Sequence, residues 1–207
     1  LLLAGLSGVR QDPDGRYKLA QLVRANQAID DVCRAYRLPC ISGKDSMKND
    51  VTMHGEKISV PPTILFSLIG NHADVRKAVS SDFKRAGDHI YLLGETHQEL
   101  GASEFAFMFR DEGSGGIGGE VPRINPERNL AMYRALTSAM SEGFVASAHD
   151  CSDGGLAVAL AECCFGAGSG AVVDISSLSR DCNHLDEWGA LFGESLGRIL
   201  VSVTPGY

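Results

Sequence analysis

The stretch "AHDCSDGGLAVAL", residues 148–160, places a histidine, two aspartates, a cysteine, a serine and two glycines directly before an apolar run. The preceding letters FVASA predict a strand, so His149 and Asp150 are expected at a strand end. Gly154 and Gly155 permit close backbone approach, and the start of the following helix carries partial positive charge suited to phosphate. Mg²⁺ prefers one or two carboxylates plus phosphate oxygens over a full protein cage. Asp150 could therefore hold a magnesium ion that bridges to phosphates.

The same stretch supports three other interpretations. Ser152 or Asp153 could cap the helix that begins at Gly154, accepting hydrogen bonds from its free N–H groups with no ligand involved. Cys151 beside His149 could be a thiol nucleophile, but adjacent residues on a strand point to opposite faces. A zinc site would need paired ligand spacing, which this stretch lacks.

A second stretch, "ISGKDSMKND" at residues 41–50, follows a short predicted strand and presents Lys44, Asp45 and Ser46 in an expected turn. It is not a Walker loop, because Lys44 is followed by Asp45 and Leu38 stands where the first glycine would be needed. Lys44 could pair with phosphate, Ser46 could donate to an oxyanion, and Asp45 could cap or bind a cation. An ordinary polar turn is the alternative.

A third stretch, "LFGESLGRILV" at residues 191–201, predicts a turn that exposes Glu194 and Ser195, with Arg198 beyond it, before a strand. Its two inner glycines indicate unusual backbone angles or close approach. By itself the stretch predicts only a turn.

The elements that must position these residues alternate along the chain. Helices are expected from Tyr17 to Tyr36, from Pro126 through Met140 and from Gly154 to Phe165, with short apolar strands between them. This alternation indicates an α/β or α+β chain in which helices cover mixed sheets. We expect two domains, residues 1–80 and 81–207.

Composition narrows the classes of function. The chain has 207 residues, 44% of them hydrophobic, and a net charge of −7, so it has no electrostatic reason to bind nucleic acid or an anionic membrane. No apolar run approaches the ~20 residues of a membrane span. Six cysteines without a C-x-x-C pair favour reduced thiols and a cytoplasmic location. The chain has no initial methionine and stops just after a strand-like run, so we expect a piece of a longer protein.

Four stretches in this order resemble the phosphoribosylformylglycinamidine synthase family, the formylglycinamide ribonucleotide amidotransferases of purine synthesis: "ISGKDSMKND", "GEVPRINPERN", "AHDCSDGGLAVALAE" and "LFGESLGRILV". "KLAQLVRANQAI" and "GASEF" also fit, so the resemblance covers roughly residues 15 to 207. It is to the second half of a synthetase subunit built from two similar halves. It implies that residues 1–80 end an N-terminal-type domain of the aminoimidazole ribonucleotide synthetase superfamily. Residues 81–207 would then be a truncated C-terminal-type domain.

The resemblance implies an ATP-dependent ligase. Such an enzyme converts formylglycinamide ribonucleotide, glutamine-derived ammonia and ATP to formylglycinamidine ribonucleotide, ADP and phosphate, with Mg²⁺. The implied partners are the first half of the synthetase and a glutaminase domain or subunit. Because the family's catalytic histidines belong to the first half, no catalytic residue is expected here, and the isolated piece is expected to be inactive.

The resemblance also implies roles for single residues. Asp150 matches a magnesium ligand, and Ser152 matches a residue that touches the nucleotide. The remaining residues expected at the nucleotide or substrate are Gly43, Lys44, Ser46, Glu194 and Ser195. Two alternatives stay open: a structural half that holds ATP or ADP without consuming it, or another superfamily member such as aminoimidazole ribonucleotide synthetase.

Overall fold

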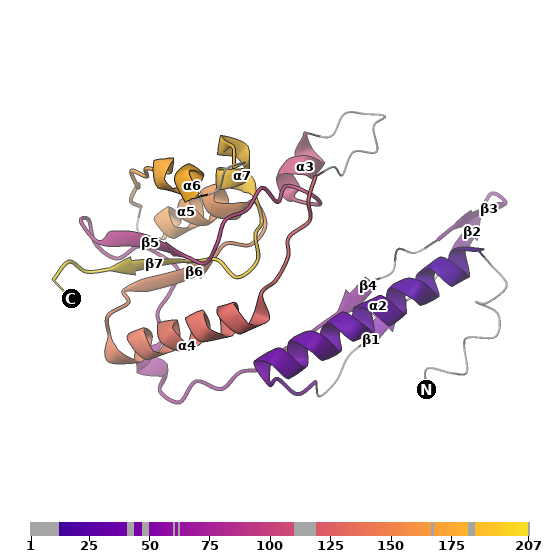
Figure 1. Ribbon diagram of the computed structural model, residues 1–207, viewed down its shortest axis with the longest axis horizontal. Coiled ribbons are helices and arrows are strands. Elements are labelled where there is room, and N and C mark those ends of the chain that lie inside the picture. The colour runs from indigo at the N-terminus through magenta and orange to yellow at the C-terminus, as the bar shows by residue number, and fades with distance from the viewer. Residues whose placement is uncertain are drawn as a thin grey trace. The chain divides into compact units, whose positions relative to one another are not determined.

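The computed structural model describes residues 13–40, 44–46, 50–59, 61, 63–109, 119–166, 168–181 and 185–206. The chain forms two compact units, residues 1–71 and 72–207 (Figure 1). Each is described by itself below.

Among its described residues, the first unit contains one long helix and two small antiparallel sheets. Helix α2 spans Pro13–Tyr36. Strands β1 (Lys44–Ser46) and β4 (Thr63–Leu65) pair in one sheet, and β2 (Val51–Met53) and β3 (Glu56–Ile58) form a hairpin.

The C-terminus of α2 lies where its sequence predicts, and its backbone shows why. Arg37 adopts a left-handed conformation with φ 56°. The N–H of Leu38 donates to the carbonyl of Cys33 at 2.9 Å, and the N–H of Arg37 donates to the carbonyl of Arg34 at 3.2 Å. This pair of bonds is the Schellman motif, which ends a helix and reverses the chain. Pro39 follows, as expected beyond a helix end.

The expected turn at Lys44–Ser46 was wrong, because these residues form strand β1. Lys44 lies opposite Leu65 and Ser46 lies opposite Thr63. The partner strand is distant in sequence, so the polar letters of the stretch do not reveal the pairing.

The second unit is built on a three-stranded antiparallel sheet. Its strands are β5 (His89–Leu93), β6 (Ser147–Asp150) and β7 (Ile199–Val203), with β7 in the centre. Ser147 and Ser202, which face each other in the register, share a buried hydroxyl hydrogen bond of 2.6 Å. At the other end of the pairing, Ile199 lies between Leu93 and Asp150. The C-terminal ends of β5 and β6 and the start of β7 therefore lie side by side at one end of the sheet.

Helices lie on both sides of this sheet. Figure 1 shows α5 (Gly155–Phe165), α6 (Ser176–Asp181) and α7 (Glu187–Phe192) on one side and α4 (Pro126–Glu142) on the other. The short helices α3 (Glu104–Met108) and η1 (Val75–Lys77) complete the unit. The core beneath α5 consists of Phe83, Cys151, Leu156, Ala159, Cys163 and Leu200.

The predicted fold class is confirmed: helices cover sheets in an α+β arrangement, and the strand pairs described here are antiparallel. The helices predicted from Pro126 and near Gly154 are α4 and α5. Asn125 caps α4 by accepting from the N–H of Arg128 at 3.1 Å, with Pro126 at the first helical position. The predicted domain boundary at residues 80/81 stays a prediction. Within the described ranges, we find no helix with both the length and the apolar run that a bilayer crossing needs.

Candidate functional site

Asp150 ends strand β6 as the sequence predicts, and its carboxylate faces solvent. The side chain is 70% exposed. The Ser152 hydroxyl donates to one carboxylate oxygen, and Nδ1 of His149 lies 3.4 Å from the other. The hydrogen bond from Ser152 is the largest cause of the lowered pKa of Asp150. Burial raises this pKa by less than the hydrogen bond lowers it, and the nearby imidazole of His149 lowers it further. Asp150 is therefore an ionised, accessible oxygen donor at neutral pH.

The surroundings of His149 and Cys151, the neighbours of Asp150, do not favour a functional role for either side chain. Nε2 of His149 lies 2.9 Å from the carboxylate of Glu162, and the ring is largely buried. Cys151 packs in the core, where burial raises the pKa of its thiol. A buried thiol that keeps its proton does not fit a nucleophile, which acts as thiolate. The geometry therefore disfavours the cysteine interpretation.

Helix α5 begins in an unusual backbone conformation. Gly154 and Gly155 have φ values of 77° and 65°, in the left-handed region that favours glycine. A Cβ on Gly155 would lie 2.5 Å from the carbonyl oxygen of Gly193 and 3.0 Å from that of Leu191. The close backbone approach expected from these glycines is therefore present, with the 191–193 segment as the neighbour.

The expected capping of α5 by Ser152 or Asp153 was wrong. The N-cap residue is Gly154, which has no side chain to cap the helix, and the Ser152 hydroxyl is directed to Asp150 instead. Glu194 takes over part of that role. Its Oε1 accepts from the N–H of Gly154 at 2.9 Å and from the N–H of Glu104, at the start of α3, at 2.9 Å. One carboxylate oxygen thus joins two helix starts.

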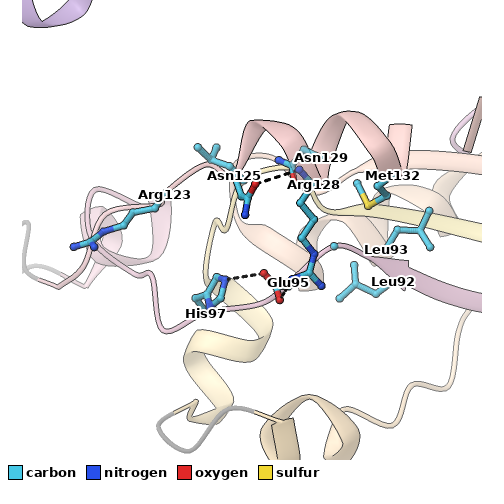
Figure 2. A pocket seen from close by; sticks show the side chains of 11 residues that line it. Leu92, Leu93, Glu95, His97, Arg123, Asn125, Arg128, Asn129 and Met132 are labelled. Carbon is cyan, nitrogen blue, oxygen red and sulfur yellow. Dashed lines mark hydrogen bonds and ion pairs between the residues drawn. The ribbon is translucent and has the colours of Figure 1, made fainter. Parts of the chain in front are cut away.

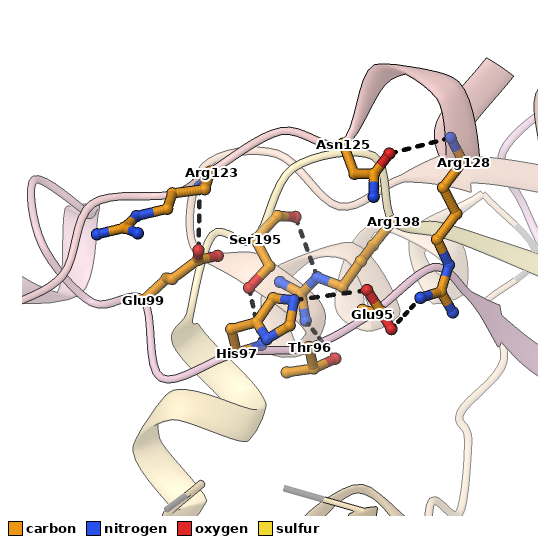
Figure 3. Close-up of polar contacts among 9 residues, drawn as sticks. All are labelled: Glu95, Thr96, His97, Glu99, Arg123, Asn125, Arg128, Ser195 and Arg198. Carbon is orange, nitrogen blue, oxygen red and sulfur yellow. Dashed lines mark hydrogen bonds and ion pairs between the residues drawn. The ribbon is translucent and has the colours of Figure 1, made fainter.

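Ser195 is buried, although the turn was expected to expose it. Its side chain is only 1% exposed, and its hydroxyl oxygen accepts from the N–H of His97 at 3.0 Å. The guanidinium of Arg198, also 1% exposed, holds the same turn. It donates from Nε to the Ser195 carbonyl at 3.2 Å and from Nη1 to the Thr96 hydroxyl at 3.2 Å (Figure 3). It also donates from Nη2 to the Gly193 carbonyl. Burial lowers the pKa of Arg198.

A second buried charge belongs to this network and was not predicted. Glu99 is 6% exposed, and its Oε1 accepts from the N–H of Arg123 at 3.0 Å (Figure 3). Its other oxygen has no hydrogen-bond partner among the residues that the structure describes. The negative charge of Glu99 offsets part of the desolvation of Arg198. No local motif marks Glu99, since its partners lie far along the chain.

A pocket of about 330 Å³ lies at the same end of the sheet, beyond the last residue of β5 (Figure 2). Glu95 lies within it between two basic side chains: its carboxylate pairs with Arg128, and its other oxygen is 3.8 Å from Nε2 of His97. The side chains of Leu93 and Met132 form an apolar part of the pocket wall. Four residues of the "VPRINPERN" run, residues 121–129, also line this pocket, although the sequence predicted only a helix start and a family resemblance there.

The remaining predicted residues lie in the first unit. Lys44 and Ser46 are in strand β1, and Gly43 lies outside the described residues. Lys44 and Asp150 belong to different units, and the contacts expected for Lys44 and Ser46 with the nucleotide or substrate stay predictions.

Comparison with known proteins gives three results. The family model "AIR synthase related protein, C-terminal domain" matches residues 85–207. The phosphoribosylformylglycinamidine synthase subunit PurL of Thermobifida fusca (strain YX) is 36% identical over 199 residues, covering 96% of this chain and 24% of the relative. The PurL subunit of Anaeromyxobacter sp. (strain Fw109-5) is 38% identical over 200 residues, covering 95% and 25%. The chain thus spans about a quarter of the length of these relatives.

Among solved structures, PurL of T. maritima complexed with FGAR matches with a TM-score of 0.52 and 24% identity, over 63% of this chain and 22% of that one. At this identity the match concerns the fold alone. The sequence relatives confirm the resemblance inferred from the four motifs. The chain belongs to the family of AIR synthase related proteins, represented here by its C-terminal domain.

Proposed function

We propose that this chain is part of phosphoribosylformylglycinamidine synthase, from the second half of its synthetase subunit. That enzyme would be an ATP-dependent carbon–nitrogen ligase of purine biosynthesis. It would convert formylglycinamide ribonucleotide, glutamine-derived ammonia and ATP to formylglycinamidine ribonucleotide, ADP and phosphate. The PurL relatives, similar over almost the whole chain, support this assignment.

The observation that carries a nucleotide role is the placement of Asp150. An ionised, exposed carboxylate stands at a strand end, just before the glycine-opened start of α5. Carboxylate oxygen is a ligand that Mg²⁺ prefers, so the donor fits the ion. Bound Mg²⁺ would supply neutralisation of charge on the nucleotide phosphates. No group of three or more possible metal-ligating side chains occurs in the described ranges, so phosphate and water oxygens would complete the coordination.

The surrounding residues would orient this site. Ser152 holds the Asp150 carboxylate through its hydroxyl and would contact the nucleotide. Glu194 fixes the Gly154 N–H, and Ser195 fixes the turn that carries Glu194. We therefore propose that Glu194 and Ser195 act mainly through the shape of the helix start.

Gly43, Lys44 and Ser46 are proposed to contact the nucleotide or ribonucleotide, as the resemblance implies. The other half of the synthetase and a glutaminase domain or subunit would be the partners, in the cytoplasm. The isolated chain is expected to be inactive, since the resemblance assigns the catalytic histidines to the first half.

A second candidate function is a nucleotide-binding half that does not consume its ligand. The pairing of His149 with Glu162 favours it, because the single histidine of the 148–160 stretch is already engaged in a contact within the protein. Single-turnover ATP hydrolysis in the complete synthetase would separate the two: loss of turnover in Asp150→Asn with intact folding supports a consumed nucleotide.

Binding itself is tested by isothermal titration of Mg–ATP against this chain. Asp150→Asn should weaken binding at least tenfold and abolish its dependence on Mg²⁺. Asp153→Asn is the matched control, because it removes the same charge from an exposed position in the same loop. Equal affinity of the wild type and Asp150→Asn would refute the metal role.

A further inference from the structure

Two cysteines in the first unit lie in contact, away from Asp150 in the sequence. The sulfur atoms of Cys33 and Cys40 are 3.5 Å apart. Cys40 is exposed and Cys33 is half-buried, and both are free thiols. Cys151 and Cys163 are also free thiols, but they are buried in the core of the second unit.

The backbone at the end of α2 holds this pair. Cys33 lies in the last turn, and its carbonyl accepts from the N–H of Leu38 in the Schellman motif. The left-handed Arg37 reverses the chain, and Pro39 restricts the next step. The reversal brings Cys40 back beside Cys33, so the contact follows from the helix ending itself and not from a mobile side chain.

We propose that Cys33 and Cys40 form a reversible intramolecular disulfide when a low-molecular-weight disulfide such as oxidised glutathione is present. The Cys40 thiolate attacks a glutathione sulfur and releases one glutathione thiolate. The Cys33 thiolate then attacks the Cys40 sulfur and releases the second. The protein loses two thiol hydrogens as protons and two electrons, and glutathione disulfide is reduced to two glutathiones.

The order of the two steps follows from the contact. The hydrogen bond with Cys40 raises the pKa of the Cys33 thiol, so Cys33 is assigned the second, resolving step. The sulfurs need to approach from 3.5 Å to a bond of about 2.05 Å, which side-chain rotation can supply. The crosslink would lock the end of α2 to the segment that leads to Lys44 in the sequence.

Peptide mapping of the whole chain tests the proposal, because trypsin cleaves at Arg34 and Arg37 between the two cysteines. After treatment with oxidised glutathione, a non-reducing digest should contain peptide 25–34 linked to peptide 38–44. Reduction with dithiothreitol should release both. Cys33→Ser should instead leave peptide 38–44 carrying glutathione.

A kinetic comparison separates a preformed pair from two cysteines that are merely close in sequence. The mixed disulfide should resolve at least tenfold faster in the native chain than in concentrated urea. Equal rates in the two states would overturn the proposal. Recovery of peptides 25–34 and 38–44 unlinked from the oxidised native chain would overturn it as well.

Discussion

Replacing Glu194 by alanine should destabilise the second unit, because one of its oxygens accepts from two helix-start N–H groups. The N–H of Gly154 is partly buried, whereas that of Glu104 is exposed and can turn to water. A hydrogen bond to a charged group contributes about 1.5–3 kcal/mol, and its negative charge near a helix start adds about 0.3–1 kcal/mol. With the exposed bond counted as nearly neutral, the loss amounts to roughly 2–4 kcal/mol.

Thermal unfolding followed by circular dichroism measures this cost. The Tm should fall by roughly 4–16 °C, since about 1 kcal/mol shifts the Tm of a chain of this size by ~2–4 °C. Glu194→Gln keeps a neutral acceptor oxygen and should lose about half as much. Glu127→Ala, at an exposed glutamate in the first turn of α4, is the control and should stay within about 0.5 kcal/mol. Equal stability of Glu194→Ala and Glu127→Ala would refute the bridging role.

Three further predictions concern the same unit. Gly155→Ala should cost well over the ~1–2 kcal/mol of a left-handed residue alone, because its Cβ meets the Gly193 carbonyl oxygen at 2.5 Å. Gly143→Ala, with φ 83° and open space, should cost only that amount, so equal urea midpoints would contradict the contact. The stabilisation that Asp150 gains from its lowered pKa is present above about pH 4 and lost as pH falls through the folded-state pKa. Ser152→Ala should raise that pKa in a carboxyl NMR titration, and an unchanged titration would count against the hydrogen bond. Burial raises the pKa of Cys163 to about 11, so its contribution to stability is present below about pH 9 and lost as pH rises towards 11. Iodoacetamide at pH 8 should leave it unmodified in the folded chain, and rapid labelling there would show that it is accessible.

Local sequence signals located the elements whose ends are set by their own residues. Pro126 and Asn125 mark the start of α4, and Tyr36 with Pro39 marks the end of α2. Asp150 was placed at a strand end because an apolar run precedes it and glycines follow. These features depend on neighbours within a few positions, so they can be predicted without the rest of the fold.

Long-range pairing was beyond the same reasoning. Glu194 reaches Gly154 across 40 positions, and the buried hydroxyl of Ser195 accepts from His97 across 98. A polar Gly-Glu-Ser run looks like an exposed turn until the partner that buries it is known. The guanidinium of Arg198, buried among carbonyls at the centre of this network, could not be inferred for the same reason.

Anomalous diffraction from crystals of this chain grown with Mn²⁺ and ATP would locate the metal relative to Asp150. A manganese peak is expected within about 2.2 Å of an Asp150 carboxylate oxygen, with phosphate oxygens in the remaining positions. A bound nucleotide whose manganese lies away from Asp150 would contradict this expectation.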